Sequence, residues 1–239
     1  MSTTLVNLWS CPRNVSTAFM YSWAQRPDTQ VWDEPLYAHY LHRSGIWHPG
    51  REEIIASMEK DGEKVVRELI LQGSDRPVAF YKQMTHHLYE LDDAFIGQTK
   101  NILFIRDPDA ILASYSKVID QPTLQDIGVK AQYDLWQKWG TQGKIDAVLD
   151  SKYLLMNPEG VLRKLCDALD IPYFSEMLQW EAGPRPEDGI WAPHWYTNVH
   201  QSTGYLPYQP KEIKLPEHIL PLSQEAKPFY EFLTARSIQ

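Results

Sequence analysis

The loop after the first apolar stretch of the chain combines hydroxyl groups with a cation. Ser10 to Thr17 reads Ser-Cys-Pro-Arg-Asn-Val-Ser-Thr and lies between an apolar, β-prone run and a helical run. A loop in this position presents backbone N–H groups and the positive end of a helix dipole to an anion, and Arg13 adds a permanent cation. The pattern predicts a phosphate-binding site; the alternative is a plain polar turn capped by Ser16.

The same loop departs from the phosphate loop of ATP-dependent enzymes. That loop needs two glycines and a lysine before its last Ser or Thr. Here the corresponding positions hold Ser10, Val15 and Ser16, and only Thr17 matches. An ATP-dependent kinase is therefore the alternative function and not the leading one. Cys11 does not fit a cysteine phosphatase either, because the arginine expected six positions later is Thr17, so we predict that Cys11 is a packing residue.

A second candidate anion site lies in the segment from Asn101 to Lys117. Arg106 comes at the end of an apolar strand, where an arginine is unfavourable unless an anion pairs with it. Ser114 follows eight residues later, on a helix for which Asp107 is the expected N-cap and Pro108 the first residue. The alternative is that Arg106 pairs with Asp107 or Asp109.

Alternating strands and helices must position these groups. The apolar runs predict strands at 5–9, 30–32, 78–81, 101–105 and 147–149. They predict helices at 18–25, 51–72, 124–139 and 158–169, and a helix opened by Pro108. Such alternation is typical of a mainly parallel sheet covered on both faces. We expect one three-layer α/β domain over residues 1–239, with the aperiodic stretch 183–210 as a lid or substrate loop.

Composition narrows the function further. The net charge is −8 and the pI about 5.5, so the chain lacks the excess of basic residues that nucleic-acid binding requires. No stretch approaches 18 uncharged apolar residues, so we expect no membrane span. Two cysteines cannot form a disulfide framework, and no signal-peptide pattern precedes the first strand, so we expect a cytoplasmic protein. The expected partner is a small molecule.

Together the two anion motifs resemble those of the sulfotransferases that use 3′-phosphoadenosine 5′-phosphosulfate. Arg106 and Ser114 match the Arg-to-Ser spacing of the family's 3′-phosphate motif. The family's 5′-phosphosulfate loop, Pro-Lys/Arg-Ser-Gly-Thr-Thr, is matched by residues 12, 13, 16 and 17. The Ser-Gly of that loop is replaced here by Asn14 and Val15, so the resemblance does not determine the backbone path of the loop. A third stretch, 150–180, is similar to the family's downstream strand and its Asn-Pro-Glu helix start.

The resemblance implies a P-loop NTPase-like fold and a metal-independent sulfonyl transfer. It also implies a set of groups that bind the donor, with Arg13 stabilising charge on the leaving phosphate. The predicted donor-binding residues of the loop and of the second motif are Pro12, Arg13, Asn14, Val15, Ser16, Thr17, Arg106 and Ser114. A non-catalytic nucleotide-binding protein of the same fold remains a further alternative.

Two candidates exist for the general base that activates the acceptor. Glu34 follows the second strand, where Pro35 fixes a loop at the ligand-binding edge of the sheet, and it resembles the glutamate base of bacterial carbohydrate sulfotransferases. His86 and His87 resemble the Lys-x-His arrangement of the cytosolic enzymes, with Lys82 as the lysine, although the spacing here is longer. We favour Glu34 and keep both histidines and Lys82 as catalytic candidates.

The stretch 183–210 contributes the last set of candidates. It is rich in Trp, Tyr, Pro and Gly, and in related folds a C-terminal loop closes over nucleotide and acceptor. We predict that Ser202, Thr203 and Gly204 contact the donor. The aromatic residues either line the ligand site or pack the loop onto the core. The acceptor itself stays open among small alcohols, sugars, phenols, amines and peptides, with polyanions disfavoured by the acidic surface.

Overall fold

The computed structural model describes residues 3–116, 121–210 and 212–239. Six strands form one sheet in the order β2-β3-β1-β4-β5-β6, and every pairing between them is parallel. The prediction of a mainly parallel sheet is therefore confirmed. The strands are β1 (Thr4–Ser10), β2 (Thr29–Asp33), β3 (Val78–Met84), β4 (Lys100–Ile105), β5 (Ala147–Asp150) and β6 (Ser237–Ile238).

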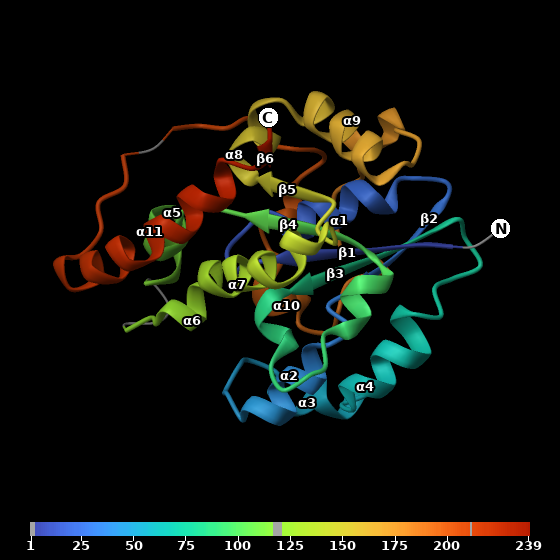
Figure 1. The fold of residues 1–239 in the computed structure, drawn as a ribbon, viewed down its shortest axis with the longest axis horizontal. Coiled ribbons are helices and arrows are strands. Elements are labelled where there is room, and N and C mark those ends of the chain that lie inside the picture. Colours follow the sequence, from blue (N-terminus) through green and yellow to red (C-terminus); the bar gives the residue numbers. More distant parts are fainter. Residues whose placement is uncertain (1–2, 117–120, 211) are drawn as a thin grey trace.

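Helices cover both faces of this sheet (Figure 1). One face packs against α1, α8 and α9 through residues such as Phe19, Leu154 and Leu165. The other packs against α4, α7 and α11 through residues such as Val65, Leu135 and Leu233. The α-helices are α1 (Ser16–Ala24), α2 (Tyr37–Ser44), α3 (Arg51–Ser57), α4 (Gly62–Val65), α5 (Pro108–Tyr115), α6 (Leu124–Ile127), α7 (Val129–Trp139), α8 (Ser151–Met156), α9 (Pro158–Leu169), α10 (Ala192–Trp195) and α11 (Leu220–Thr234).

Two predicted helices are each divided by a short break. The predicted helix 51–72 is wrong as one element, because Met58 is extended and Asp61 caps a new helix by accepting from the Lys64 N–H at 3.3 Å. A π-helical turn, Val66–Ile70, then continues from α4. The predicted helix 124–139 divides at Gly128, whose φ of +73° ends α6. A Cβ at Gly128 would lie 3.3 Å from Pro12, so this glycine also lets the α6–α7 junction approach the phosphate loop.

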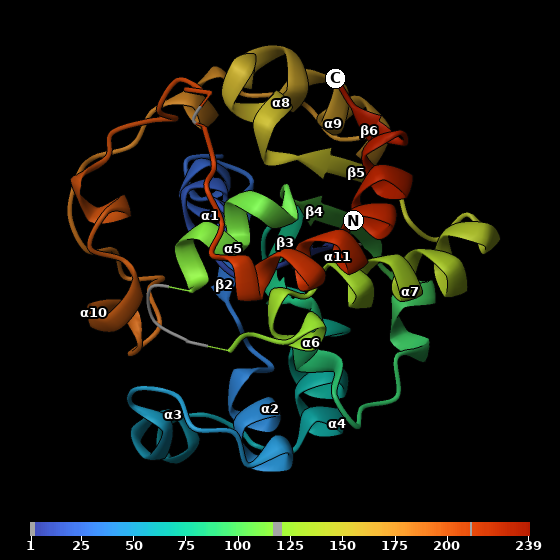
Figure 2. The ribbon, with the colours of Figure 1, turned by 90° about the vertical axis from the view of Figure 1, so that its left-hand side faces the viewer.

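Several elements were not predicted from the sequence, among them α2, α8, α10, α11 and β6. The stretch 183–210 has little regular structure, as expected, but it holds α10 and pairs with the preceding segment through a bridge between Gln179 and Gly204. Its aromatic residues Trp191 and Tyr196 are buried against α2. Figure 2 shows α11 lying beside α5 and α7, with α10 set apart from them.

Candidate functional site

The loop between β1 and α1 has the features of an anion site. Val15 is the N-cap of α1, and no side chain accepts a hydrogen bond there, so Ser16 does not cap the helix as the alternative interpretation requires. The first-turn amides of α1 therefore keep no side-chain partner within the described residues. Because the N-terminus of a helix attracts negative charge, these amides are suited to bind an anion.

Neighbouring polar side chains hold the loop in place. Asn14 donates from Nδ2 to the carbonyl of Phe104 at 2.9 Å and accepts from the Val15 N–H at 2.9 Å. Gln132 of α7 donates to the same Phe104 carbonyl. Cys11 is buried beneath the loop, and burial raises the pKa of its thiol to about 12, which agrees with the predicted packing role. Asn14 thus ties the loop to the end of β4.

The structure brings the two anion motifs together. Arg13 Nε donates to Ser114 Oγ at 3.0 Å, and Arg106 Nη1 donates to the backbone carbonyl of Arg13. Arg13 has a φ of +57°, a backbone conformation that L-residues adopt at a cost. The junction therefore places two guanidinium groups beside the first turn of α1.

The carboxylates near Arg106 have other partners. Asp107 caps α5 by accepting from the Asp109 N–H at 2.8 Å, as predicted, and Pro108 begins that helix. Asp109 binds Ser223 and lies 3.2 Å from Lys227. Within the described residues neither Arg13 nor Arg106 forms an ion pair, and burial lowers the pKa of Arg106. Two cations without a carboxylate partner form a site suited to phosphate groups.

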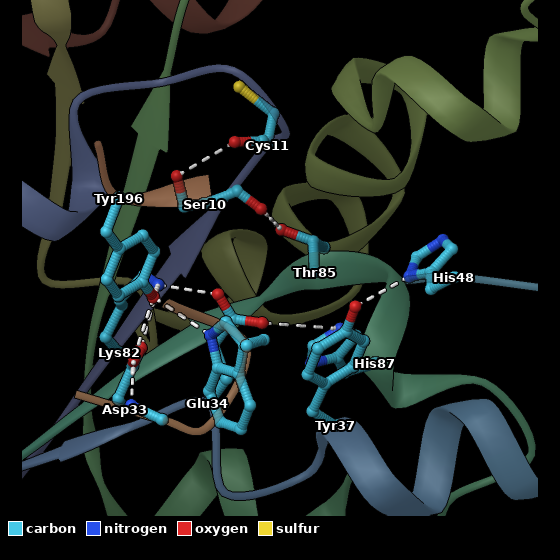
Figure 3. A network of polar contacts seen from close by, with 12 residues as sticks. Ser10, Cys11, Asp33, Glu34, Tyr37, His48, Lys82, Thr85, His87 and Tyr196 are labelled. Carbon is cyan, nitrogen blue, oxygen red and sulfur yellow. Dashed lines mark hydrogen bonds and ion pairs between the residues drawn. The ribbon is translucent and has the colours of Figure 1, made fainter. Parts of the chain in front are cut away.

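A second polar cluster lies at the carboxyl ends of β2 and β3 (Figure 3). Lys82 is 1% exposed, and its ammonium lies 2.8 Å from Asp33 Oδ1, 2.5 Å from Glu34 Oε1 and 2.7 Å from the Tyr196 hydroxyl. The register that pairs Asp33 with Lys82 across the two parallel strands brings these groups together. Glu34 has a φ of +46°, so this loop residue, like Arg13, is held in an unfavourable backbone conformation.

Burial and charge set the protonation of this cluster. Burial alone would lower the pKa of Lys82, but Asp33 and Glu34 raise it well above its ordinary value, so the ammonium stays charged. Burial raises the pKa of Glu34, the Lys82 charge opposes that rise, and the Asp33 charge adds to it. Glu34 is therefore a more basic carboxylate than one in water.

His87 lies beside Glu34, whereas His86 lies beside His87. His87 Nε2 is 3.8 Å from Glu34 Oε2, and the His87 ring stacks on Tyr37 at 4.9 Å. His86 packs edge-on against Tyr40. Burial lowers the pKa of His86 to about 3 and that of His87 well below its ordinary value. Both rings are uncharged at neutral pH, and the lowered pKa makes each of them a weaker base than a histidine in water.

Comparison with known families identifies the kind of domain that carries these two clusters. A family model described as a sulfotransferase domain matches residues 4–237 of the chain. The chain belongs to the sulfotransferase domain family. The resemblance first seen in the loop and in the Arg106 motif is thereby confirmed.

Solved structures confirm the fold of this sulfotransferase domain. It is similar to the sulfotransferase domain from the curacin biosynthetic pathway, with 15% identity, a TM-score of 0.54 and 98% of both chains covered. The sulfotransferase domain from the Synechococcus PCC 7002 olefin synthase shows 17% identity, a TM-score of 0.56 and 96% coverage of both. A sulfotransferase from Alicyclobacillus acidocaldarius shows 12% identity and a TM-score of 0.54, covering 100% of this chain and 98% of that one. The α/β, P-loop NTPase-like fold is therefore as predicted.

Curated relatives add sequence similarity over a shorter part of their own length. Two Arabidopsis thaliana proteins, branched-chain-amino-acid aminotransferase-like proteins 1 and 2, are each 38% identical over 230 residues. The match covers 96% of this chain and 41% of each relative. Their names thus describe proteins more than twice as long as the matched part.

The predicted donor contacts in the C-terminal stretch of this sulfotransferase domain lie away from the phosphate loop. Ser202 accepts from the Trp180 indole at 3.1 Å, and Thr203 accepts from the Trp180 N–H. Thr203 and Gly204 line a groove with Gln25, which follows the C-terminal end of α1. The phosphate loop meets the opposite end of that helix, roughly 13 Å away along nine residues. The structure therefore does not bring Ser202, Thr203 and Gly204 together with the other predicted donor-binding residues.

Sequence reasoning missed Asp33 and did not single out Tyr196 among the aromatic residues. Asp33 was visible only as the neighbour of Glu34, and Tyr196 lies more than a hundred residues from Lys82 in the chain. The segment 186–191 near Tyr196 also lines a groove of about 730 Å³ along β2, with Asp33 at one end. Among the described residues, no helix is long and apolar enough to cross a membrane.

Proposed function

We propose that this domain transfers a sulfonyl group from 3′-phosphoadenosine 5′-phosphosulfate to a hydroxyl or amine of a small acceptor. The observation that carries the proposal is the meeting of Arg13, Arg106 and Ser114 at the open N-terminus of α1. Such a donor carries a 3′-phosphate and a 5′-phosphosulfate, and it supplies the sulfonyl group when bound. Two arginines that form no ion pair within the described residues fit these two anionic groups.

The chain's own residues divide the work of binding the donor. Arg106 and Ser114 would hold the 3′-phosphate, as in the family motif they match. Arg13, with Ser16, Thr17 and the first-turn amides of α1, would stabilise the charge that develops on the 5′-phosphate as it leaves. No step requires a proton from these groups, because the bisphosphate leaves as an anion.

The acceptor's proton would pass to Glu34. Its Oε1 is bound to Lys82, whereas no side chain lies within hydrogen-bond distance of Oε2 in the described residues; His87 Nε2, at 3.8 Å, is the nearest group recorded. Oε2 is thus the oxygen available to a hydroxyl or amine. The raised pKa of Glu34 improves its ability to accept the proton. In this assignment Lys82 positions Glu34 and the two histidines shape the pocket wall.

A donor-dependent screen tests the activity directly. The domain is incubated with 3′-phosphoadenosine 5′-phosphosulfate and a panel of alcohols, phenols, sugars and amines, and products are detected by mass spectrometry. We expect a mass gain of one SO₃ group on at least one acceptor class, together with release of adenosine 3′,5′-bisphosphate. Bisphosphate binding with no transfer to any acceptor would favour the non-catalytic alternative.

Nucleotide selectivity gives a test that needs no acceptor. Adenosine 3′,5′-bisphosphate should raise the melting temperature by about 5–10 °C at a hundredfold excess over its Kd, which corresponds to about 2.7 kcal/mol. Adenosine 5′-monophosphate should raise it far less, because it cannot reach Arg106 and Ser114 with a 3′-phosphate. Differential scanning fluorimetry at matched concentrations makes the comparison. Equal shifts would rule out the 3′-phosphate assignment.

Chelation separates this proposal from the kinase alternative. Sulfonyl transfer should persist in EDTA, because the arginines and amides supply the positive charge that Mg²⁺ supplies to a triphosphate. The activity is measured with and without EDTA, with ATP hydrolysis as the parallel assay. Loss of transfer on chelation with recovery on adding Mg²⁺, or Mg²⁺-dependent ATP hydrolysis, would contradict the mechanism.

A further inference from the structure

The hydroxyl of Tyr196 lies at the centre of the buried cluster beside Glu34. It accepts from Lys82 Nζ at 2.7 Å and from the Trp191 indole at 3.0 Å, and it donates to Asp33 Oδ2 at 2.7 Å. Tyr196 is 4% exposed, so water does not replace these bonds. The Tyr196 hydroxyl therefore has all its hydrogen-bonding positions occupied, and it links Asp33 of β2 to Lys82 of β3.

Lys82 is equally saturated. An ammonium has three N–H donors and no acceptor. Asp33, Glu34 and Tyr196 receive them at 2.8, 2.5 and 2.7 Å, respectively. With every donor used inside the protein, Lys82 has none left for a bound ligand. Its position relative to Glu34 is therefore fixed by the other two partners.

We propose that Asp33 and Tyr196 are positioning residues that fix Lys82 so that it holds one oxygen of Glu34 and leaves the other free to take the acceptor's proton. The inference rests on the proposed function, in which Glu34 is the general base. Gly189 supports it, because its N–H donates to Asp33 Oδ2 at 3.1 Å and so helps to hold that carboxylate. The stretch 183–210 would then be part of the base's support and would stay in place during the reaction.

Titratable groups face Glu34 from several elements. Asp33 comes from the end of β2, Lys82 from β3, and His87 from the turn after β3, with His86 beside it. Tyr37 of α2 and Tyr196 of the C-terminal stretch complete the surroundings. Burial raises the pKa of Glu34 most; of these groups, Lys82 lowers that pKa and Asp33 raises it, so a change in either contact should shift the basicity of Glu34.

Two substitutions should move that balance in opposite directions. Asp33→Asn removes the competing carboxylate and leaves the Lys82 charge to Glu34 alone, so the pKa of Glu34 should fall. Tyr196→Phe removes a donor from Asp33, which then draws Lys82 toward itself and away from Glu34, so the pKa of Glu34 should rise. We expect shifts of at least about half a pH unit in each case.

Carbon-detected NMR titration of the ligand-free protein measures these shifts. The protein is labelled with glutamate carrying ¹³C at the side-chain carboxyl, and the Glu34 signal is assigned by its absence in Glu34→Gln. Tyr173→Phe is the matched control, because its buried hydroxyl has no hydrogen-bond partner among the described residues and Tyr173 packs outside the site. Its Glu34 titration should match that of the unsubstituted protein.

Opposite shifts in Asp33→Asn and Tyr196→Phe support the inference. An unchanged Glu34 titration in either variant, or shifts in the same direction, would overturn it, provided that the variant unfolds cooperatively. If one variant does not fold, the other decides alone by the sign of its shift. The readout needs neither donor nor acceptor, so failure of the proposed function, seen as no sulfonyl transfer by the unsubstituted protein, is distinguished from failure of the positioning.

Discussion

Replacing Glu34 by glutamine should lower kcat by about 10²–10⁴-fold while leaving the affinity for adenosine 3′,5′-bisphosphate unchanged. The amide keeps the size of the side chain and an oxygen that can accept from Lys82, which lies 2.5 Å from Glu34 Oε1. What it loses is an oxygen able to take a proton. The rate is measured with the acceptor found in the product screen, and nucleotide affinity by calorimetry.

The histidine variants are the controls for this experiment. His87→Ala should lower kcat much less and act mainly on KM, because the His87 ring packs between Tyr37 and Tyr40 and shapes the wall beside Glu34. His86→Ala should behave similarly. If Glu34→Gln keeps a near-normal kcat while His86→Ala or His87→Ala abolishes turnover, the base is a histidine and the arrangement resembles that of the cytosolic enzymes.

The pH dependence of kcat adds a second test of the same assignment. Burial raises the pKa of Glu34, so the rate should rise with pH through an inflection above the ordinary glutamate value and stay flat beyond it. Burial lowers the pKa of His86 to about 3, below that range, and it lowers the pKa of His87 well below its ordinary value. An inflection that survives in Glu34→Gln would therefore belong to another group.

The sequence predicted the part of the fold that positions the donor. β1, the loop, α1 and β4 follow from apolar runs with clear ends, and Asp107 and Pro108 mark the start of α5 by local bonding alone. These elements depend on interactions between residues close together in the chain, so they can be predicted from a single sequence. The break at Gly128 was missed because the apolar stripe continues through it, while the chain there comes close to the distant residue Pro12. The break at Asp61 falls in the polar run 59–64 and follows from a local cap, so this one could have been predicted from the sequence.

The sequence predicted the anion site more completely than the cluster around Glu34 and Lys82. Arg13, Arg106 and Ser114 could be found because a strand end and a fixed spacing mark them, and the structure places them in contact. Glu34 and Lys82 could be proposed one by one, since each follows or ends a strand. Their ion pair depends on the neighbouring positions of β2 and β3 in the sheet, which no local pattern encodes.

The C-terminal stretch shows where such reasoning stops. Its aromatic residues were expected either to line the ligand site or to pack the loop onto the core, and Trp191 and Tyr196 pack on α2 and bond to each other, while Tyr196 also bonds to Lys82. Ser202, Thr203 and Gly204 have the composition of a phosphate contact, yet they bond with the segment around Trp180. Without periodicity in this stretch, the sequence carries no information on which face of the sheet it covers.

Replacing Arg106 by alanine should weaken binding of adenosine 3′,5′-bisphosphate by about 2–4 kcal/mol, or roughly 30- to 1,000-fold in Kd. The guanidinium is partly buried, has no carboxylate partner among the described residues and faces the site from the end of β4. Arg106→Lys should recover part of the affinity, because it restores the charge but not the two-pronged hydrogen bonding. Calorimetric titration of each variant measures the loss.

Arg106 also donates to the backbone carbonyl of Arg13, so its removal could weaken binding by loosening the loop instead. The two causes differ in their effect on adenosine 5′-monophosphate, which has no 3′-phosphate. A direct phosphate contact predicts that Arg106→Ala reduces bisphosphate affinity to the level of the monophosphate and leaves the monophosphate unaffected. A loosened loop predicts an equal loss for both nucleotides, because each places its 5′-phosphate at the amides of α1. An equal loss would assign Arg106 to holding the loop and would leave the 3′-phosphate without its main cation.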